Sequence, residues 1–168
     1  MLYFKTATPL DAQNLAQLVN SAYRGDSSKL GWTTEADLLD GQRTDAKNLT
    51  ALINEPENQI EMAIDSDSHS LVGCVYLKKE NSHTLYFGML TVAPKLQTKG
   101  TGKALIKHIE EFAKKNHYNF IRISVIQFRT ELIKFYERRG FVSTGQFEDF
   151  PEDDPQFGIP KINGLKLM

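Results

Sequence analysis

The sequence predicts a mixed α/β fold in which helices cover the faces of a central sheet. Apolar residues recur at helical spacing in 15–22 and alternate with polar residues in 60–64, which indicates both kinds of element in one chain. The predicted elements follow the order strand, helices, three strands, helix, strand, helix and two strands. This order favours a layered domain with one sheet and helices packed against it.

The size and composition suit a single domain. The chain has 168 residues, of which 40% are hydrophobic and 24% are charged. These values are ordinary for a globular protein, and the length is sufficient for one substantial core. No internal repeat, low-complexity tract or linker divides the sequence, so residues 1–168 are predicted to form one domain.

The first part of the chain is predicted to contain one strand and three helices. Residues 2–6 form the strand, and Thr8 caps the helix that follows it. After a polar loop, a short helix is predicted in 33–39. Thr44 is expected to cap a third helix, which ends before Pro56.

The rest of the chain is predicted to contain six strands and two helices. The strands are predicted in 60–64, 71–77, 85–92, 121–125, 141–147 and 162–168. One helix opens at Gly100 and Gly102, and the other spans 129–139 with Gly140 as its C-terminal cap. An acidic loop, Glu148–Pro155, lies between the last two predicted strands.

The most informative stretch joins the strand 85–92 to the next helix. Pro94 and a polar loop lead to Gly100 and Gly102, which open the helix. Such a junction directs several backbone N–H groups to one point at the positive end of the helix dipole, an arrangement that binds a pyrophosphate. A simpler alternative is that the two glycines serve a tight turn and close packing.

Two other glycine motifs are excluded. The phosphate loop of nucleotidases requires G-x-x-x-x-G-K-[ST], whereas Gln97 stands at its first glycine and Ala104 follows Lys103 in this chain. The dinucleotide fingerprint requires G-x-G-x-x-G, and Leu105 occupies the position of its third glycine.

A second motif, apolar-Tyr-Glu-x-x-Gly-Phe, occurs in 135–141 on a predicted helix that follows a strand. Together with Gln-x-x-Gly-x-Gly in 97–102, it resembles the signatures of the GCN5-related N-acetyltransferase (GNAT) family. The resemblance implies a central mixed, mostly antiparallel sheet of about seven strands with helices on both faces. It also implies an enzyme that moves the acetyl group of its co-substrate acetyl-CoA directly to a primary amine.

The resemblance also suggests where acetyl-CoA binds. The backbone at Leu90 and Val92 would pair with the pantetheine arm like an added strand. The pyrophosphate would lie against the backbone N–H groups of the glycine loop, which consists of Gln97, Thr98, Lys99, Gly100, Thr101, Gly102 and Lys103. The two lysines add charge there or are solvated surface. Thr98 stands where glycine is common in the family, and Arg129 stands where asparagine is common. Arg129 is expected either to reach the cofactor phosphates or to lie on the helix surface.

The catalytic roles also follow from the resemblance. Tyr136 would protonate the leaving thiolate as general acid, and the Leu90 N–H would polarise the thioester carbonyl. The alternative for Tyr136 is a core tyrosine that bonds a backbone group. Many members of the family carry a glutamate, as general base, on the strand before the glycine loop. The corresponding residues here, 85–90, include no carboxylate. Glu35 is the candidate base, with the alternative that it is a capping or solvated glutamate.

The composition excludes several classes of partner. The formal net charge of −1 argues against broad binding of nucleic acid or anionic membranes. No apolar run approaches the ~20 residues that span a bilayer, and no signal peptide is recognisable, so a cytoplasmic protein is expected. The sole cysteine, Cys74, is expected to be a buried, inert thiol in a reducing compartment. The histidines lack metal-ligand spacing, so no metal is expected.

The acceptor is expected to be a small molecule with an amine, and polyamine-like compounds, amino acids, aminoglycosides and protein N-termini or lysines all remain open. Tyr23, Trp32 and 37–45 are candidates for one wall of its pocket. The acidic residues in 148–154 would attract a cationic amine, or they are simply solvated. Two other functions remain open, a non-catalytic module that binds or senses acyl-CoA and a protein-interaction domain that uses the acidic loop. The strand predicted in 162–168 offers a surface for a homodimer.

Overall fold

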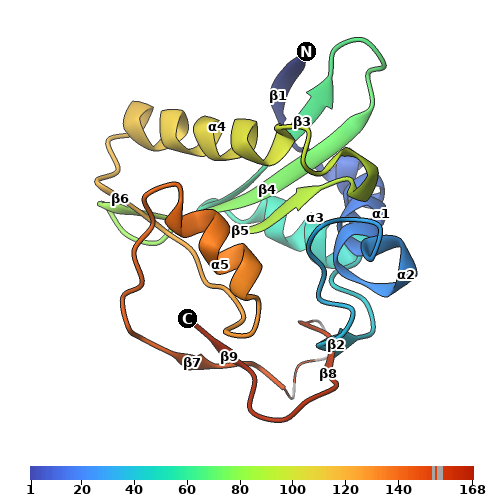
Figure 1. The fold of residues 1–168 in the computed structure, drawn as a ribbon. Coiled ribbons are helices and arrows are strands. Elements are labelled where there is room, and N and C mark those ends of the chain that lie inside the picture. The colour runs from blue at the N-terminus through green and yellow to red at the C-terminus, as the bar shows by residue number, and fades with distance from the viewer. Residues whose placement is uncertain (153, 155–156) are drawn as a thin grey trace.

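A five-stranded sheet forms the centre of the molecule (Figure 1). The computed structural model describes every residue except 153, 155 and 156. The strands are β1 (Leu2–Thr6), β3 (Asn58–Asp65), β4 (Leu71–Lys79), β5 (Thr84–Val92) and β6 (Phe120–Arg122), in the spatial order β1-β3-β4-β5-β6. The first four strands pair antiparallel, and β6 joins β5 in parallel. The predicted mixed, mostly antiparallel sheet is therefore confirmed.

Helices cover both faces of this sheet. On one face, α1 (Ala12–Tyr23) and α3 (Ala46–Asn54) pack on a core that includes Met62 and Cys74. On the other face, α4 (Thr101–Lys115) and α5 (Thr130–Glu137) pack on a core that includes Ala63 and Phe87. Met62 and Ala63 enter different cores because adjacent residues of a strand point to opposite faces. Among the described residues, no helix has the length and apolar character needed to cross a membrane.

Short pieces of structure complete the chain near its C-terminus. β2 (Leu39–Asp40) pairs with β8 (Ile159–Pro160), and β7 (Glu148–Asp149) pairs with β9 (Lys166–Leu167). In Figure 1 these four strands lie together at the lower end of the view. A small third core, formed by Leu39, Ile126, Phe150 and Leu165, holds them to the rest of the molecule. The C-terminal segment is thereby fixed beside the end of the sheet where β5 and α5 lie.

The sequence predicts about seven strands, and the main sheet has five. Residues 141–147 form no strand, and their exposure explains why, since Val142 is 86% and Phe147 55% exposed. Only Phe141 of this segment packs on the core, and a segment that buries so little apolar surface has little reason to join a sheet. The strand predicted in 162–168 is reduced to β9 by the turn at Gly164, whose φ is +71°. Of the acidic loop, residues 153 and 155 lie outside the described part of the chain.

Two predictions about the helices were also wrong. Residues 33–39 form turns and the start of β2 rather than a helix. The cap of α3 is Asp45 and not Thr44, since the Asp45 carboxylate accepts a hydrogen bond from the Asn48 N–H at 2.7 Å. A carboxylate at a helix N-terminus also interacts favourably with the helix dipole, which a hydroxyl does much less. The remaining helical elements are η1 (Pro9–Asp11), α2 (Gly25–Ser28) and η2 (Pro94–Leu96).

A bulge in β5 opens the sheet toward α1. The β4–β5 register shifts between Cys74 and Tyr76, so that β5 carries one extra residue there. Met89 adopts a positive φ of +51° within this bulge. The Tyr23 hydroxyl, at the end of α1, donates a hydrogen bond of 2.9 Å to the Leu90 carbonyl oxygen. A bulge redirects the backbone groups of a strand, and this bond fixes the Leu90–Thr91 peptide in one orientation.

Two residues of the glycine loop, between η2 and α4, have left-handed backbone conformations. Thr98 has a φ of +68°, and Gly100, the N-cap of α4, has a φ of +91°. This conformation is easy for glycine and strained for a residue with a Cβ atom. Gly140 also has a positive φ, of +85°, just after α5, which confirms the predicted C-terminal cap.

Gly100→Ala is expected to lower the free energy of unfolding by about 1 kcal/mol, because alanine is strained at positive φ. Steric crowding does not contribute, since nothing lies within 4 Å of a Cβ atom built at this position. Gly102→Ala is the matched control. Gly102 is helical, and its new Cβ would meet Phe135 at an ordinary 3.6 Å, so stability should stay equal or rise. Urea unfolding of both variants is the measurement, and equal stability of Gly100→Ala and the parent would contradict the argument.

Candidate active site

A cavity of about 360 Å³ lies between the glycine loop and α5. We call it the glycine-loop cavity. Its lining residues come from the loop, from the end of β5, from α5 and from the turn before β2; they are Trp32, Thr33, Leu90, Val92, Gln97, Thr98, Gly100, Gly102, Lys103, Leu132, Phe135, Arg138 and Arg139. Three of these side chains are cationic, and the N-terminus of α4 opens onto the same space. The cavity is therefore suited to a ligand with phosphate groups.

The Gln97 side chain fastens the glycine loop to its neighbours. Its Oε1 accepts a hydrogen bond of 2.9 Å from the Trp32 N–H, and its Nε2 donates one of 3.2 Å to the Val92 carbonyl. The Trp32 ring packs on Phe135 of α5, with 5.6 Å between the ring centroids. The guanidinium of Arg139 in turn lies 3.5 Å from the centroid of the Phe135 ring. Gln97 thus holds the walls of the cavity in position with both ends of its amide.

Most of the residues predicted to hold the cofactor line this cavity. Lys99, Thr101 and Arg129 do not; Lys99 is exposed, Thr101 is buried with its methyl group near Gly73, and Arg129 belongs to an ion pair described below. Arg138 and Arg139 also line the cavity, and neither was predicted as a site residue. The signal that points to them is a pair of cations directly before the cap Gly140, at the end of the helix that faces the loop.

A smaller cavity of about 130 Å³ adjoins the first one. We call it the tyrosine cavity, since Tyr23, Tyr86 and Tyr136 line it. Leu90 and Leu132 line both cavities, so the two spaces meet at the β5 bulge. A molecule that extends from the glycine loop past Leu90 would therefore end beside Tyr136.

Tyr136 is 4% exposed and is held by three aromatic rings. The ring centroids of Phe87, Phe135 and Phe141 lie 5.9, 5.3 and 5.6 Å from its own. Its hydroxyl makes no hydrogen bond among the described residues. Burial raises the pKa of Tyr136 well above its ordinary value, and the nearby Tyr23 adds to the effect. The hydroxyl is therefore protonated at neutral pH and has its proton available for a ligand.

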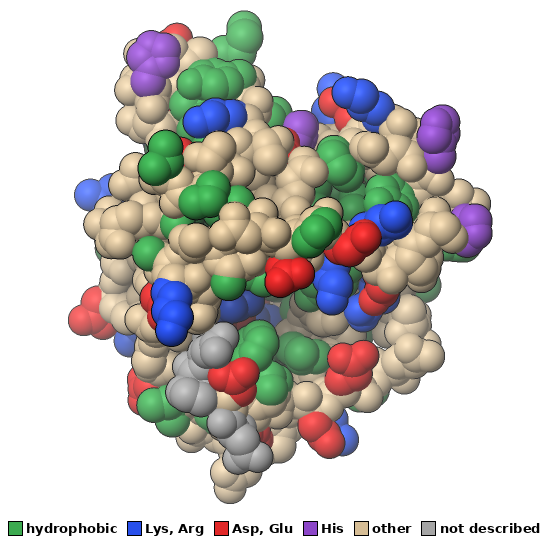
Figure 2. Space-filling model, turned by 180° about the vertical axis from the view of Figure 1, so that it is seen from behind, with side chains coloured by type: hydrophobic (Ala, Val, Ile, Leu, Met, Phe, Trp, Pro, Cys, Tyr) green, Lys and Arg blue, Asp and Glu red, His purple; other side chains and the backbone are tan. Residues whose placement is uncertain are grey.

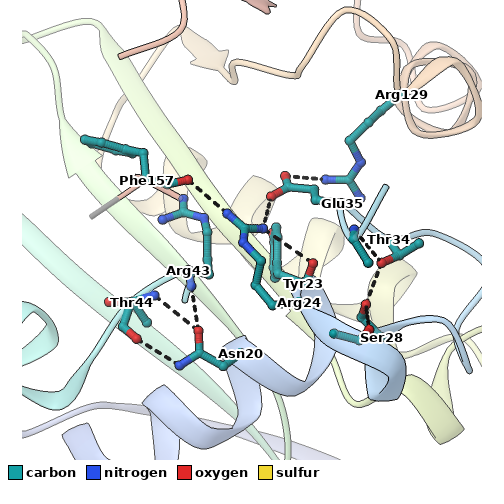
Figure 3. A network of polar contacts seen from close by, with 12 residues as sticks. Asn20, Tyr23, Arg24, Ser28, Thr34, Glu35, Arg43, Thr44, Arg129 and Phe157 are labelled. Carbon is teal, nitrogen blue, oxygen red and sulfur yellow. Dashed lines mark hydrogen bonds and ion pairs between the residues drawn. The ribbon is translucent and has the colours of Figure 1, made fainter. Parts of the chain in front are cut away.

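A buried ion pair, drawn in Figure 3, contributes Glu35 and Arg129 to the cavity that Tyr136 lines. The carboxylate of Glu35 accepts hydrogen bonds from Arg24 and, at 2.8 Å, from Arg129. All three side chains are at most 8% exposed. Arg24 also donates to the Phe157 carbonyl at 2.9 Å, and Arg129 donates to the Thr33 hydroxyl at 2.8 Å. The group thus connects the end of α1, the turn before β2, the start of α5 and the C-terminal segment.

The ion pair changes the interpretation of two predicted site residues. Burial alone would raise the pKa of Glu35, but the guanidinium groups of Arg129 and Arg24 hold this pKa below its ordinary value. A carboxylate with a lowered pKa and both oxygens engaged is poorly suited to remove a proton, so the geometry favours a structural role for Glu35. Arg129 is 7% exposed and is bonded to Glu35, so it lies neither on the surface nor at the glycine loop.

Trp32 was expected in the wall of the acceptor pocket, and it lies in the glycine-loop cavity instead. Tyr23, the other aromatic residue of that expected wall, does line the tyrosine cavity. Burial raises the pKa of Tyr23 to about 12, so its hydroxyl remains a donor to Leu90 at neutral pH. Cys74 is fully buried, and burial raises the pKa of its thiol to about 12, which agrees with an inert cysteine.

Glu35→Gln is expected to lower the free energy of unfolding at pH 7 by about 3–5 kcal/mol, because two buried guanidinium groups lose their counter-charge. The pKa of Glu35 is lowered in the folded protein, so its contribution is present above the unfolded value of about 4.3 and is lost as the pH falls through the folded pKa. Thermal unfolding as a function of pH is the measurement.

The difference in the free energy of unfolding between the parent protein and Glu35→Gln should accordingly be large at pH 7 and shrink below about pH 4. Glu137→Gln, on the exposed side of α5, is the control and should change stability by less than about 0.5 kcal/mol. A gap that stays constant with pH would show that Glu35 is not stabilised as an anion.

Solved structures with the same fold include several acetyltransferases. An N-acetyltransferase from Staphylococcus aureus Mu50 gives a TM-score of 0.70 at 17% identity, over 99% of this chain and 96% of that chain. A GNAT family acetyltransferase from Elizabethkingia anophelis, solved with acetyl-CoA bound, gives 0.64 at 19% identity, over 99% and 94%. An IAA acetyltransferase from Bacillus cereus ATCC 14579 gives 0.66 at 16% identity, over 99% and 97%. At these identities the likeness is one of fold.

A search of curated protein sequences finds no match to this chain. The family model described as an acetyltransferase (GNAT) domain matches residues 35–150, which include the glycine loop, the β5 bulge and Tyr136. The match covers more than half of the sequence and both motifs on which the resemblance depends. The chain therefore belongs to the GNAT acetyltransferase family.

Proposed function

We propose that this protein transfers the acetyl group of acetyl-CoA to a primary amine of a small acceptor, by direct attack of the amine on the thioester. The observation that carries the proposal is the meeting of two cavities at Leu90. One of them is lined by cations and a helix N-terminus, and the other contains the buried hydroxyl of Tyr136. This arrangement supports a phosphate-bearing donor on one side and an acceptor on the other.

The residues of the glycine-loop cavity fit acetyl-CoA. Backbone N–H groups at the start of α4 suit its pyrophosphate, and Lys103, Arg138 and Arg139 offset the negative charge of its phosphates. The pantetheine arm would then run past Val92 to the β5 bulge. The Tyr23 hydrogen bond to the Leu90 carbonyl would hold the backbone of the β5 bulge beside the thioester.

The proposed reaction forms a C–N bond and breaks the C–S bond of the thioester. The amine attacks in its neutral form, because the lone pair must be free. The Leu90 N–H would stabilise the negative charge that develops on the carbonyl oxygen. Tyr136 would give its proton to the leaving sulfur. Glu35 is the sole carboxylate among the described residues that line the tyrosine cavity, and it is engaged by two arginines. We therefore propose that the proton of the amine leaves through water.

Tyr136→Phe is expected to reduce turnover by about 10²–10⁴-fold, the usual contribution of one well-placed acid. The binding of acetyl-CoA should be nearly unchanged, since the ring and its aromatic contacts remain. The measurements are the release of CoA in the presence of a panel of amines and the calorimetric titration of acetyl-CoA. Unchanged turnover, or a collapse of acetyl-CoA binding, would contradict the role assigned to Tyr136.

Two variants test the acetyl-CoA site in the same calorimetric titration. Gly102→Trp places a large side chain in the glycine-loop cavity and should abolish binding, whereas Lys99→Ala, outside that cavity, should leave it intact. Binding of acetyl-CoA without transfer to any amine would favour the alternative of a non-catalytic acyl-CoA-binding module. A folded parent protein that binds no acetyl-CoA would contradict the proposed function as a whole.

A further inference from the structure

We propose that Arg43 binds a carboxylate group of the acceptor, so that the substrates of this enzyme are small amines that carry a carboxylate, as amino acids do. The inference rests on the proposed acetyltransferase function and adds the substrate class to it. It depends on the place of Arg43 in the cavities, on the contacts of its side chain and on the charge around it.

Arg43 lies where a small acceptor would enter. A third, wider cavity of about 620 Å³ adjoins the tyrosine cavity, on the side away from the glycine loop. We call it the entry cavity. The residues that line both spaces are Arg43, Tyr86, Gly88, Met89, Ser124, Phe157 and Leu167. An acceptor that reaches Tyr136 through the entry cavity therefore passes the Arg43 side chain.

The Arg43 guanidinium lies against two aromatic rings and forms no ion pair within 4 Å among the described residues. It lies 5.6 Å from the ring centroid of Tyr23 and 6.0 Å from that of Phe157. The backbone N–H of Arg43 is fixed by a 2.7 Å hydrogen bond to Asn20 Oδ1. Within the described part of the chain, the guanidinium has neither a hydrogen bond nor an ion pair. Its planar fork of N–H donors matches the two oxygens of a carboxylate.

The described groups around Arg43 carry more positive than negative charge. Arg24, Arg43 and Arg129 all act electrostatically on the one carboxylate of Glu35. Three positive groups and one negative group leave a surplus of two positive charges. Both oxygens of Glu35 are already engaged by Arg24 and Arg129. Arg43, which is only partly buried and faces the cavities, is therefore the guanidinium left to pair with a ligand carboxylate.

Among the described residues that line the entry cavity, the other carboxylates do not neutralise this surplus. Glu80 is bonded to Arg122 through the guanidinium Nε at 2.9 Å. Glu55 and Glu148 line the entry cavity and are exposed to solvent. Figure 2 shows cationic side chains recessed in a hollow near the centre of this face, with acidic side chains around its edge. An amine with a carboxylate has both charges that such a surface can attract.

Acetyl transfer to matched pairs of acceptors tests the inference. Each amino acid of a panel is compared with its own carboxamide, which has the same amine and side chain but no negative charge. We expect kcat/KM to be about 10–100-fold higher for the carboxylates, the effect of one charge-assisted hydrogen-bonded contact. Carboxamides have the less basic amines, so a site that ignored the carboxylate would favour them instead.

Arg43→Gln should remove the preference by lowering kcat/KM for the carboxylates and leaving the carboxamides nearly unchanged. Arg43→Lys keeps the charge without the planar fork and should retain part of the preference. Lys78→Gln removes an exposed cation of the entry cavity and should behave like the parent protein. A carboxylate-to-carboxamide ratio near one in the parent, or a ratio that Arg43→Gln leaves intact, would overturn the inference while the acetyltransferase function stands.

A binding experiment gives a readout that does not depend on turnover. The CoA-loaded protein is titrated with an N-acetyl amino acid and with the corresponding N-acetyl carboxamide. The carboxylate should bind at least about ten-fold more tightly, and Arg43→Gln should abolish the difference. Equal binding of the two compounds would overturn the inference. Absence of transfer to every amine tested would instead contradict the proposed function, whatever this titration shows.

Discussion

The carboxylate of Glu35 is the interaction on which the rest of the site depends. Its two arginine partners come from the end of α1 and the start of α5, helices that lie on opposite faces of the sheet. Arg24 reaches further, to the carbonyl of Phe157 in the C-terminal segment. Glu35, Arg129 and Phe157 all line the tyrosine cavity, so the buried ion pair joins three parts of its wall. Glu35 thus connects the elements around the tyrosine cavity, while both of its oxygens are engaged by arginines.

Cationic side chains are concentrated in two separate parts of the site, one on each side of Leu90. Lys103, Arg138 and Arg139 face the glycine-loop cavity, where backbone N–H groups of α4 also point. Arg43 faces the tyrosine and entry cavities, on the other side of Leu90. The formal net charge of −1 gives no sign of either cationic region, because it is summed over the whole chain. Two separated cationic regions suit a donor with phosphates and an acceptor with an anionic group.

Local signals explain which features the sequence could predict. The glycine loop, the Gly140 cap and the two-faced sheet depend on residues close together in the chain, and all three are present in the structure. The Glu35–Arg129 pair joins residues 94 positions apart, so spacing along the chain carries no sign of it. The segment 141–147 has apolar residues that suggest a strand, but it buries little of them. Pairing partners far along the chain, and not local propensity, decide such cases.

The central claim is that donor and acceptor meet at the β5 bulge, beside Leu90 and Tyr136. A crystal structure of the protein with acetyl-CoA tests it most directly. The account predicts the pyrophosphate against the start of α4, the thioester oxygen within hydrogen-bonding distance of the Leu90 N–H, and the sulfur next to the Tyr136 hydroxyl. A pantetheine arm that leaves the glycine-loop cavity without reaching Leu90, or a sulfur remote from Tyr136, would contradict it.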